Sequence, residues 1–123
     1  MPHEIMTKGN YQPLHDVTNW DKVREIAAQL TAGQTVPPVV LIEELGSHVA
    51  VTGTHRQAAA QKSGVSIPAI VLTMEEACEA MQIQDLSEYD HADHDTRYEQ
   101  IEQWAKQHGH DDLAAAMSDQ YAQ

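Results

Sequence analysis

The sequence is poor in several residue types, and each shortage excludes a class of protein. Its 123 residues include no phenylalanine and a single cysteine, Cys78, so no internal disulfide framework can form. No apolar run approaches the ~20 residues that a membrane-spanning helix needs, and the first residues lack the basic-then-apolar pattern of a secretory signal. We therefore expect a cytoplasmic, single-domain protein whose core is filled by aliphatic residues and methionine.

Basic residues are also scarce. Seven lysines and arginines face 19 aspartates and glutamates, which gives a formal net charge of −12. Lys and Arg supply most of the non-specific affinity for nucleic-acid phosphates, so we expect no direct binding to DNA or RNA. Two kinds of partner stay open, namely a small anion drawn into a local basic pocket and a basic protein that contacts acidic helices.

The order of residue patterns predicts an α+β fold, in which helices pack on a small mixed β-sheet. Residues 1–18 hold two prolines and a glycine without sustained periodicity, which predicts an N-terminal arm lying across the domain. Residues 19–73 predict an α/β core, and residues 74–123 predict an acidic helical extension. Because the join at Thr73 has no Gly, Pro or Ser linker, we expect the extension to pack on the core as one domain.

The core region is predicted to contain a helix over about 19–32, a proline-led strand over 39–42, a returning strand over 48–52, a helix over 54–63 and a strand over 67–72. Asn19 or Thr18 can cap the first helix. Trp20 is expected to lie at the edge of the core rather than to serve as a platform for a ligand. Gly64 suits the left-handed position that ends the second helix.

The extension is predicted to contain three helices, which begin at a capping box at Thr73, at a second capping box at Thr96, and near Asp111. Cys78 lies within the first of them and is expected to be a core residue rather than a reactive thiol. Asp and His residues gather over 85–95, where His91 and His94 suggest a metal site. A solvated loop is the preferred interpretation, because no fixed ligand order is present.

The most informative segment is a strand that turns into a helix at Gly53. A strand that turns at a glycine into a helix directs the free N–H groups of the helix toward one point. Thr54, His55 and Arg56 follow the glycine, so this turn is a candidate anion site. The alternative is an ordinary junction with polar residues at its solvent end.

A second candidate lies at the end of the proline-led strand. Glu43 and Glu44 could hold Mg²⁺ or act as a base. The preferred interpretation of the pair is a charged strand end before a turn.

The core region resembles the ParB/sulfiredoxin superfamily over about residues 19–73. The likeness lies in three segments in the right order: Val36-Pro37-Pro38-Val39-Val40-Leu41, Thr52-Gly53-Thr54-His55-Arg56-Gln57-Ala58-Ala59, and Ile67-Pro68-Ala69-Ile70-Val71-Leu72. Sulfiredoxins have a Gly-Cys-His-Arg turn in this place, and ParB N-terminal domains have a Gly-Glu-Arg-Arg turn.

The resemblance implies a nucleoside triphosphate ligand, with Mg²⁺, whose phosphates are held at the turn. Gly53 would allow close approach of the backbone, Arg56 would clamp a phosphate, and His55 would contact a phosphate or transfer a proton. Thr54 replaces the cysteine of sulfiredoxins and the glutamate of ParB proteins. Because a hydroxyl is a poor substitute for a thiolate, sulfiredoxin activity is not expected.

Two hypotheses of function follow, from different classes. The first is a nucleotide- or phosphate-binding ParB-like protein, acting as an NTP-dependent phosphotransferase or hydrolase, with Gly53, Thr54, His55 and Arg56 as its site. The alternative is a non-enzymatic acidic interaction protein, either partner-binding or a DNA mimic, that keeps the fold without the chemistry. A nuclease ranks last, because the sequence offers no convincing metal cluster.

Overall fold

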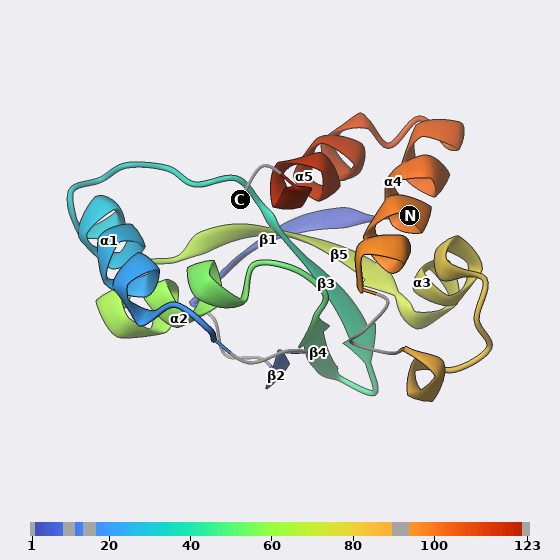
Figure 1. Cartoon of the computed structure of the whole chain (residues 1–123), viewed down its shortest axis with the longest axis horizontal. Helices are drawn as coiled ribbons and strands as arrows, with labels where there is room; N and C mark the ends of the chain where they lie inside the picture. The colour runs from blue at the N-terminus through green and yellow to red at the C-terminus, as the bar shows by residue number, and fades with distance from the viewer. Residues whose placement is uncertain (1, 9–11, 14–16, 90–93, 122–123) are drawn as a thin grey trace.

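The computed structural model describes residues 2–8, 12–13, 17–89 and 94–121. The elements, in chain order, are β1 (His3–Thr7), β2 (Gln12–Pro13), α1 (Trp20–Thr31), β3 (Val39–Glu44), β4 (Ser47–Ala50), α2 (Thr54–Ser63), β5 (Ile67–Thr73), α3 (Met74–Met81), the 3-10 helix η1 (Leu86–Glu88), α4 (His94–Gln107) and α5 (Asp111–Tyr121). The α+β fold class predicted from the sequence is confirmed (Figure 1).

The five strands form one mixed sheet in the order β1-β5-β3-β4-β2. β3 and β4 are an antiparallel hairpin, and α2 then carries the chain across to β5, which runs parallel to β3. β1 adds to the outer side of β5 as an antiparallel edge strand. The start of β3 lies beside the segment that leads into α2.

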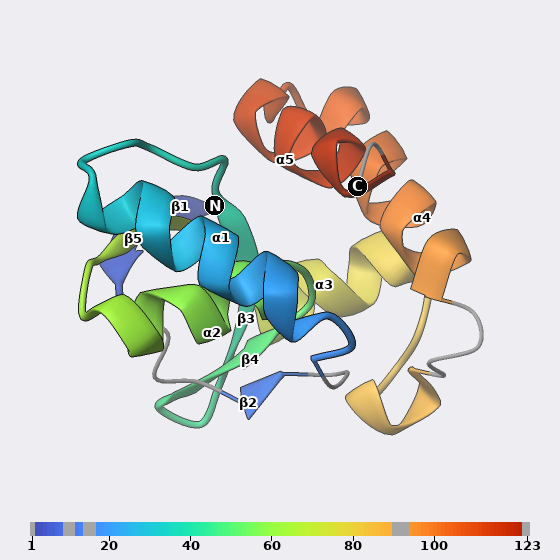
Figure 2. The same cartoon turned by 60° about the vertical axis from the view of Figure 1, so that its left-hand side comes forward.

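Helices cover both faces of the sheet, and the strands show this in their side chains. Val39 and Leu41 of β3 belong to the apolar cluster beneath α1 and α2, whereas Val40 and Ile42 belong to the cluster beneath α3, α4 and α5. Successive strand residues point to opposite faces, so a strand covered on both sides is apolar throughout. Figures 1 and 2 show the two helical layers on either side of the sheet.

Two short strands of the sheet, β1 and β2, lie within the predicted N-terminal arm. His3 pairs with Val71 and Thr7 with Ile67, and β2 pairs with the end of β4. An edge strand as short as β1 gains its place through backbone hydrogen bonds, and its only inward apolar contact with a core cluster comes from half-buried Ile5. That single residue gives no periodicity for sequence reasoning to detect. Residues 9–11 and 14–16 lie outside the described residues.

The first helix begins at the predicted cap, but one of its residues is placed differently. The Asn19 side chain accepts a hydrogen bond from the Lys22 backbone N–H at 3.1 Å. Trp20 was expected at the edge of the core and is instead 59% exposed, so that prediction is wrong. The α1 members of the apolar cluster begin at Val23, and the first turn of the helix extends beyond them.

The helices of residues 74–121 pack on the sheet. Thr73 forms the predicted capping box with Glu76, since each side chain accepts a hydrogen bond from the other residue's backbone N–H. Buried residues of α3, α4 and α5 share one cluster with β3 and β5. The second capping box was placed at Thr96, but α4 begins two residues earlier, at His94. Within the described ranges, no helix combines the length and apolar character needed to cross a bilayer.

Candidate anion-binding site at the start of α2

Gly53 is the N-cap of α2, and its conformation is set by the sheet beneath it. Its φ of 79° lies in the left-handed region that favours glycine. A Cβ at this position would lie 2.9 Å from Val39 Cβ and closer still to Val39 Cγ1. The absence of a side chain therefore lets the turn lie directly against the first residue of β3. The packing of the turn alone is enough to require glycine here.

The residue before the glycine ties the turn to the same strand. The Thr52 hydroxyl accepts a hydrogen bond from the Val40 backbone N–H at 3.0 Å, and the Thr52 N–H donates to the Val40 carbonyl at 3.3 Å. Val51 N–H donates to that same carbonyl at 2.9 Å. These bonds fix where α2 begins relative to the sheet.

Arg56 points into the protein rather than outward. It is only 2% exposed, and its Nη1 donates to the carbonyls of Pro37 at 2.5 Å and Pro38 at 3.1 Å. Backbone carbonyls outside a helix or sheet ladder need donors, and the guanidinium supplies them for the segment that leads into β3. The side chain that was predicted to clamp a phosphate therefore also stabilises the segment that leads into β3.

His55 joins the starts of two helices. Its Nε2 accepts a hydrogen bond from the Asn19 backbone N–H at 3.1 Å and lies 3.4 Å from the Thr18 hydroxyl. A ring nitrogen that accepts from a backbone N–H carries no proton, so in the neutral ring the proton sits on Nδ1. His55 is half-buried. Of the three predicted side chains at this turn, that of His55 is the most exposed, because Thr54 is 3% and Arg56 is 2% exposed.

Gln57 is a site residue that sequence reasoning missed. It is 4% exposed, and its Nε2 has no hydrogen-bond partner among the described residues. Side chains on a helix lean toward its N-terminus, so the Gln57 amide lies over the first turn of α2. A buried amide donor without a partner is costly. In the sequence, the only sign of a role at this site is its position about one helical turn after Gly53.

The charge around this turn differs from that at the other helix starts. The first turns of α1, α3, α4 and α5 each contain at least one Asp or Glu, whereas the first turn of α2 contains none. Gly53 also supplies no side-chain cap. An acid or a capping side chain offsets the partial positive charge of a helix N-terminus. At α2 neither is present, and Arg56 adds a positive charge.

With this geometry in place, the chain can be compared with known proteins. A model of the ParB N-terminal domain matches residues 1–87. The chain belongs to that family. No curated protein matches the chain. The family match is wider than the resemblance over 19–73, because it takes in β1, β2 and α3 of this ParB-like domain.

The structure separates Glu43 and Glu44 from the turn. They are exposed at the far end of β3, where they pair with His48 and Ser47 of β4, whereas Gly53 packs on Val39 at the start of that strand. Four residues of strand span about 13 Å, so these carboxylates are too far away to contact a phosphate held at the turn. This ParB-like domain holds no cluster of three or more metal-binding side chains within the residues described. His91 and the side chain of His94 lie outside those residues.

Cys78 is also remote from the turn. It is half-buried on α3, which covers the opposite face of the sheet from α2. Burial raises the pKa of its thiol, and the negative charges of Asp85 and Glu88 raise it further. A raised pKa lowers the thiolate fraction at neutral pH. The environment of Cys78 in this ParB-like domain therefore fits the prediction of an unreactive thiol.

Proposed function

We propose that this ParB-like domain binds a nucleotide or another small phosphate ligand at the turn formed by Gly53, Thr54, His55 and Arg56. The observation that carries the proposal is the charge of the α2 start. In a chain of net charge −12, this helix has no acid in its first turn and no side-chain cap on its first N–H groups. A phosphate at a helix N-terminus gains from both the dipole and the N–H donors.

The residues of the turn would contribute to binding in different ways. The imidazole of His55 is proposed as the direct contact, because it is half-buried whereas Gly53, Thr54 and Arg56 are buried. The N–H groups of the first turn are proposed to hold the phosphate beside it. Arg56 would contribute its positive charge from beneath the turn while it holds the Pro37 and Pro38 carbonyls. The Gln57 amide supplies a further donor over the same turn.

The proposal extends to a nucleoside triphosphate with Mg²⁺, as the family resemblance implies. A phosphotransferase or hydrolase also needs a base within hydrogen-bond reach of the attacking group. Glu43 and Glu44 are too far from the turn to be that base, and the Thr54 hydroxyl is buried. Mg²⁺ would therefore arrive on the phosphates of the nucleotide, and binding rather than catalysis is the function that the geometry supports best.

Calorimetry with ATP, CTP and GTP, each with Mg²⁺, tests the proposal. A matched pair of variants, His55→Asp and His55→Asn, separates binding from folding. Aspartate adds a negative charge to the first turn of α2, which favours the helix but repels a phosphate. Asparagine has nearly the same shape without the charge. We expect binding by the wild type, weaker binding by His55→Asn, and none by His55→Asp, with all three proteins folded by circular dichroism.

Two results would contradict the proposal. If the folded wild type binds none of the three nucleotides, then the ligand is not a nucleotide. If His55→Asp binds as well as His55→Asn, then the phosphates of the ligand are not held at the α2 start.

A second candidate function, an acidic interaction protein, is favoured by the distribution of charge. Residues 74–123 contain 13 of the 19 acidic residues but only two of the seven basic ones. Exposed examples lie on each helix of this region, including Glu75, Glu88, Glu99 and Asp111. A basic protein, including one that itself binds DNA, would be drawn to such a surface. A pull-down supports this function if moderate salt releases the partner, and speaks against it if the partner stays bound.

A further inference from the structure

We propose that Trp20 is the stacking platform for the base of a nucleotide whose phosphates lie at the start of α2. This inference rests on the proposed function and deepens it, because it names a ligand with a planar base rather than a phosphate alone. Four observations support it: the exposure of Trp20, its contrast with Trp104, its distance from His55, and the balance of charge around it.

Trp20 is exposed to a degree that is unusual for its size. It is 59% exposed, and the only other large apolar residues exposed to this extent in the described part of the chain are Met6 and Leu45. The second tryptophan, Trp104, shows the ordinary arrangement. It is 8% exposed, and its indole N–H donates to Glu79 Oε2 at 2.9 Å. A large aromatic surface facing water is a candidate contact for a ligand.

Trp20 is also close to the candidate phosphate site. The residue before it, Asn19, donates its backbone N–H to His55 Nε2 at 3.1 Å. Chain geometry then limits the Trp20 Cα to about 8.5 Å from that nitrogen. α1 and α2 pack side by side (Figure 2), and the hydrogen bond between Asn19 and His55 links the starts of the two helices.

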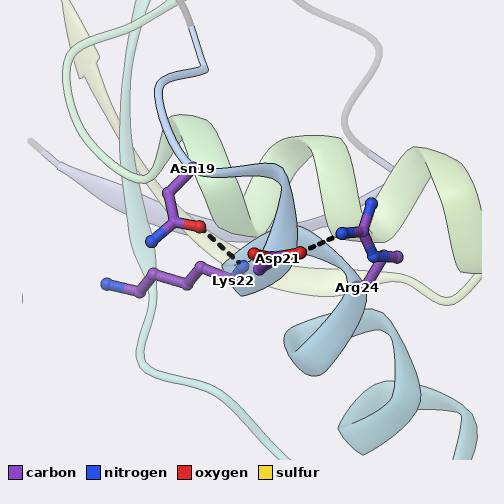
Figure 3. Close-up of polar contacts among 4 residues, drawn as sticks. All are labelled: Asn19, Asp21, Lys22 and Arg24. Atoms are coloured by element: carbon purple, nitrogen blue, oxygen red, sulfur yellow. Dashed lines mark hydrogen bonds and ion pairs between the residues drawn. The ribbon is translucent and has the colours of Figure 1, made fainter.

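The charges beside Trp20 do not repel a phosphate ligand. Asp21 is the acid in the first turn of α1, and it forms an ion pair with Arg24 on the same helix (Figure 3). Lys22 adds a second positive charge and the exposed Glu25 adds a second negative one, so the charges of residues 21–25 balance. The start of α1 therefore differs in charge from the acidic helices on the other face of the sheet.

A planar base is the ligand feature that such a surface selects. Every nucleobase has a π-face, and stacking on an aromatic side chain is tolerant of base identity. We therefore expect both purine and pyrimidine nucleotides to gain from Trp20, whereas inorganic phosphate and tripolyphosphate gain nothing. Removing the aromatic side chain on which one base stacks corresponds to an affinity loss of about 5- to 150-fold.

The test compares ATP, CTP and sodium tripolyphosphate on the full chain. Calorimetry is run on the wild type, Trp20→Ala and Leu45→Ala, the last being a matched control that removes an exposed apolar side chain at the β3–β4 turn. Fluorescence is run on Trp104→Phe, in which Trp20 is the only indole. We expect both nucleotides to quench Trp20, and Trp20→Ala to weaken nucleotide binding about 5- to 150-fold. Its affinity for tripolyphosphate should match that of the wild type.

Two failures are distinguishable. If tripolyphosphate and the nucleotides bind equally well and Trp20→Ala changes neither, then the stacking inference is overturned while phosphate binding at the turn stands. If neither tripolyphosphate nor a nucleotide binds to the wild type, both proposals are overturned. An equal loss of nucleotide binding in Leu45→Ala also counts against Trp20, because that side chain lies at the other end of β3.

Discussion

Replacing Gly53 by alanine should cost far more stability than its single added methyl group suggests. Two physical effects combine at this position. A non-glycine residue at a φ of 79° is strained by about 1–2 kcal/mol. The new Cβ would also lie 2.9 Å from Val39 Cβ and nearer to Val39 Cγ1, and overpacking of this kind costs about 1–3 kcal/mol. We therefore expect the free energy of unfolding to fall by about 2–5 kcal/mol.

The same helix provides the control. Gly64 ends α2 at a φ of 71°, but a Cβ there would meet no atom within 4 Å. Gly64→Ala should therefore lose only the conformational part, about 1–2 kcal/mol. The difference between the two variants, measured by urea unfolding at equilibrium, isolates the close approach of the turn to Val39.

A double mutant checks the cause of that difference. Val39→Ala removes the Cγ1 atom that the new methyl group would meet, so it should restore part of the stability lost in Gly53→Ala. The reasoning is refuted if Gly53→Ala costs no more than Gly64→Ala, or if the double mutant loses the sum of the two single losses.

Three further predictions concern the rest of the chain. Tyr98→Phe removes the hydroxyl that donates to the Val51 carbonyl at 2.8 Å, so urea unfolding should show a loss of about 1–2 kcal/mol. Burial opposes ionisation of Glu76, but hydrogen bonds from Thr73 hold the pKa of its carboxyl below the ordinary value of 4.5. Its contribution is complete above pH 4.5 and is lost as the pH falls through the lower folded pKa; Glu76→Gln should flatten the fall in melting temperature over that window. Cys78 should react with a thiol reagent at pH 8 more slowly than a small free thiol, and Asp85→Asn should speed the reaction.

Much of the fold could be predicted because local signals agreed with it. The apolar face of α1, the prolines before β3, the glycines around α2 and the capping box at Thr73 each specify an element through a local rule. The strands within residues 1–18 could not be predicted in the same way. β1 is held by pairing with β5, a strand more than 60 residues later in the chain, and nothing in its own five residues encodes that partner.

Trp20 shows why exposure is harder to predict than secondary structure. Its position three residues before Val23 places it on the apolar stripe of α1 by periodicity alone. Whether that stripe is covered depends on how far the neighbouring elements reach, and the cluster beneath α1 begins only at Val23. Periodicity specifies the direction of a side chain, but it does not specify what lies in that direction.

At the candidate site, the same sequence motif stabilises the fold and would bind the proposed ligand. Gly53 is needed for its approach to Val39, and Arg56 is needed for the carbonyls of Pro37 and Pro38. Both residues would therefore be retained in a relative that binds nothing, because both support the start of β3. Under the two proposals above, the residues that would distinguish a binding protein from a relative that keeps only the fold are His55 and Trp20. A likeness in the turn is thus evidence for the fold, and the evidence for a nucleotide must come from substitutions at those two positions.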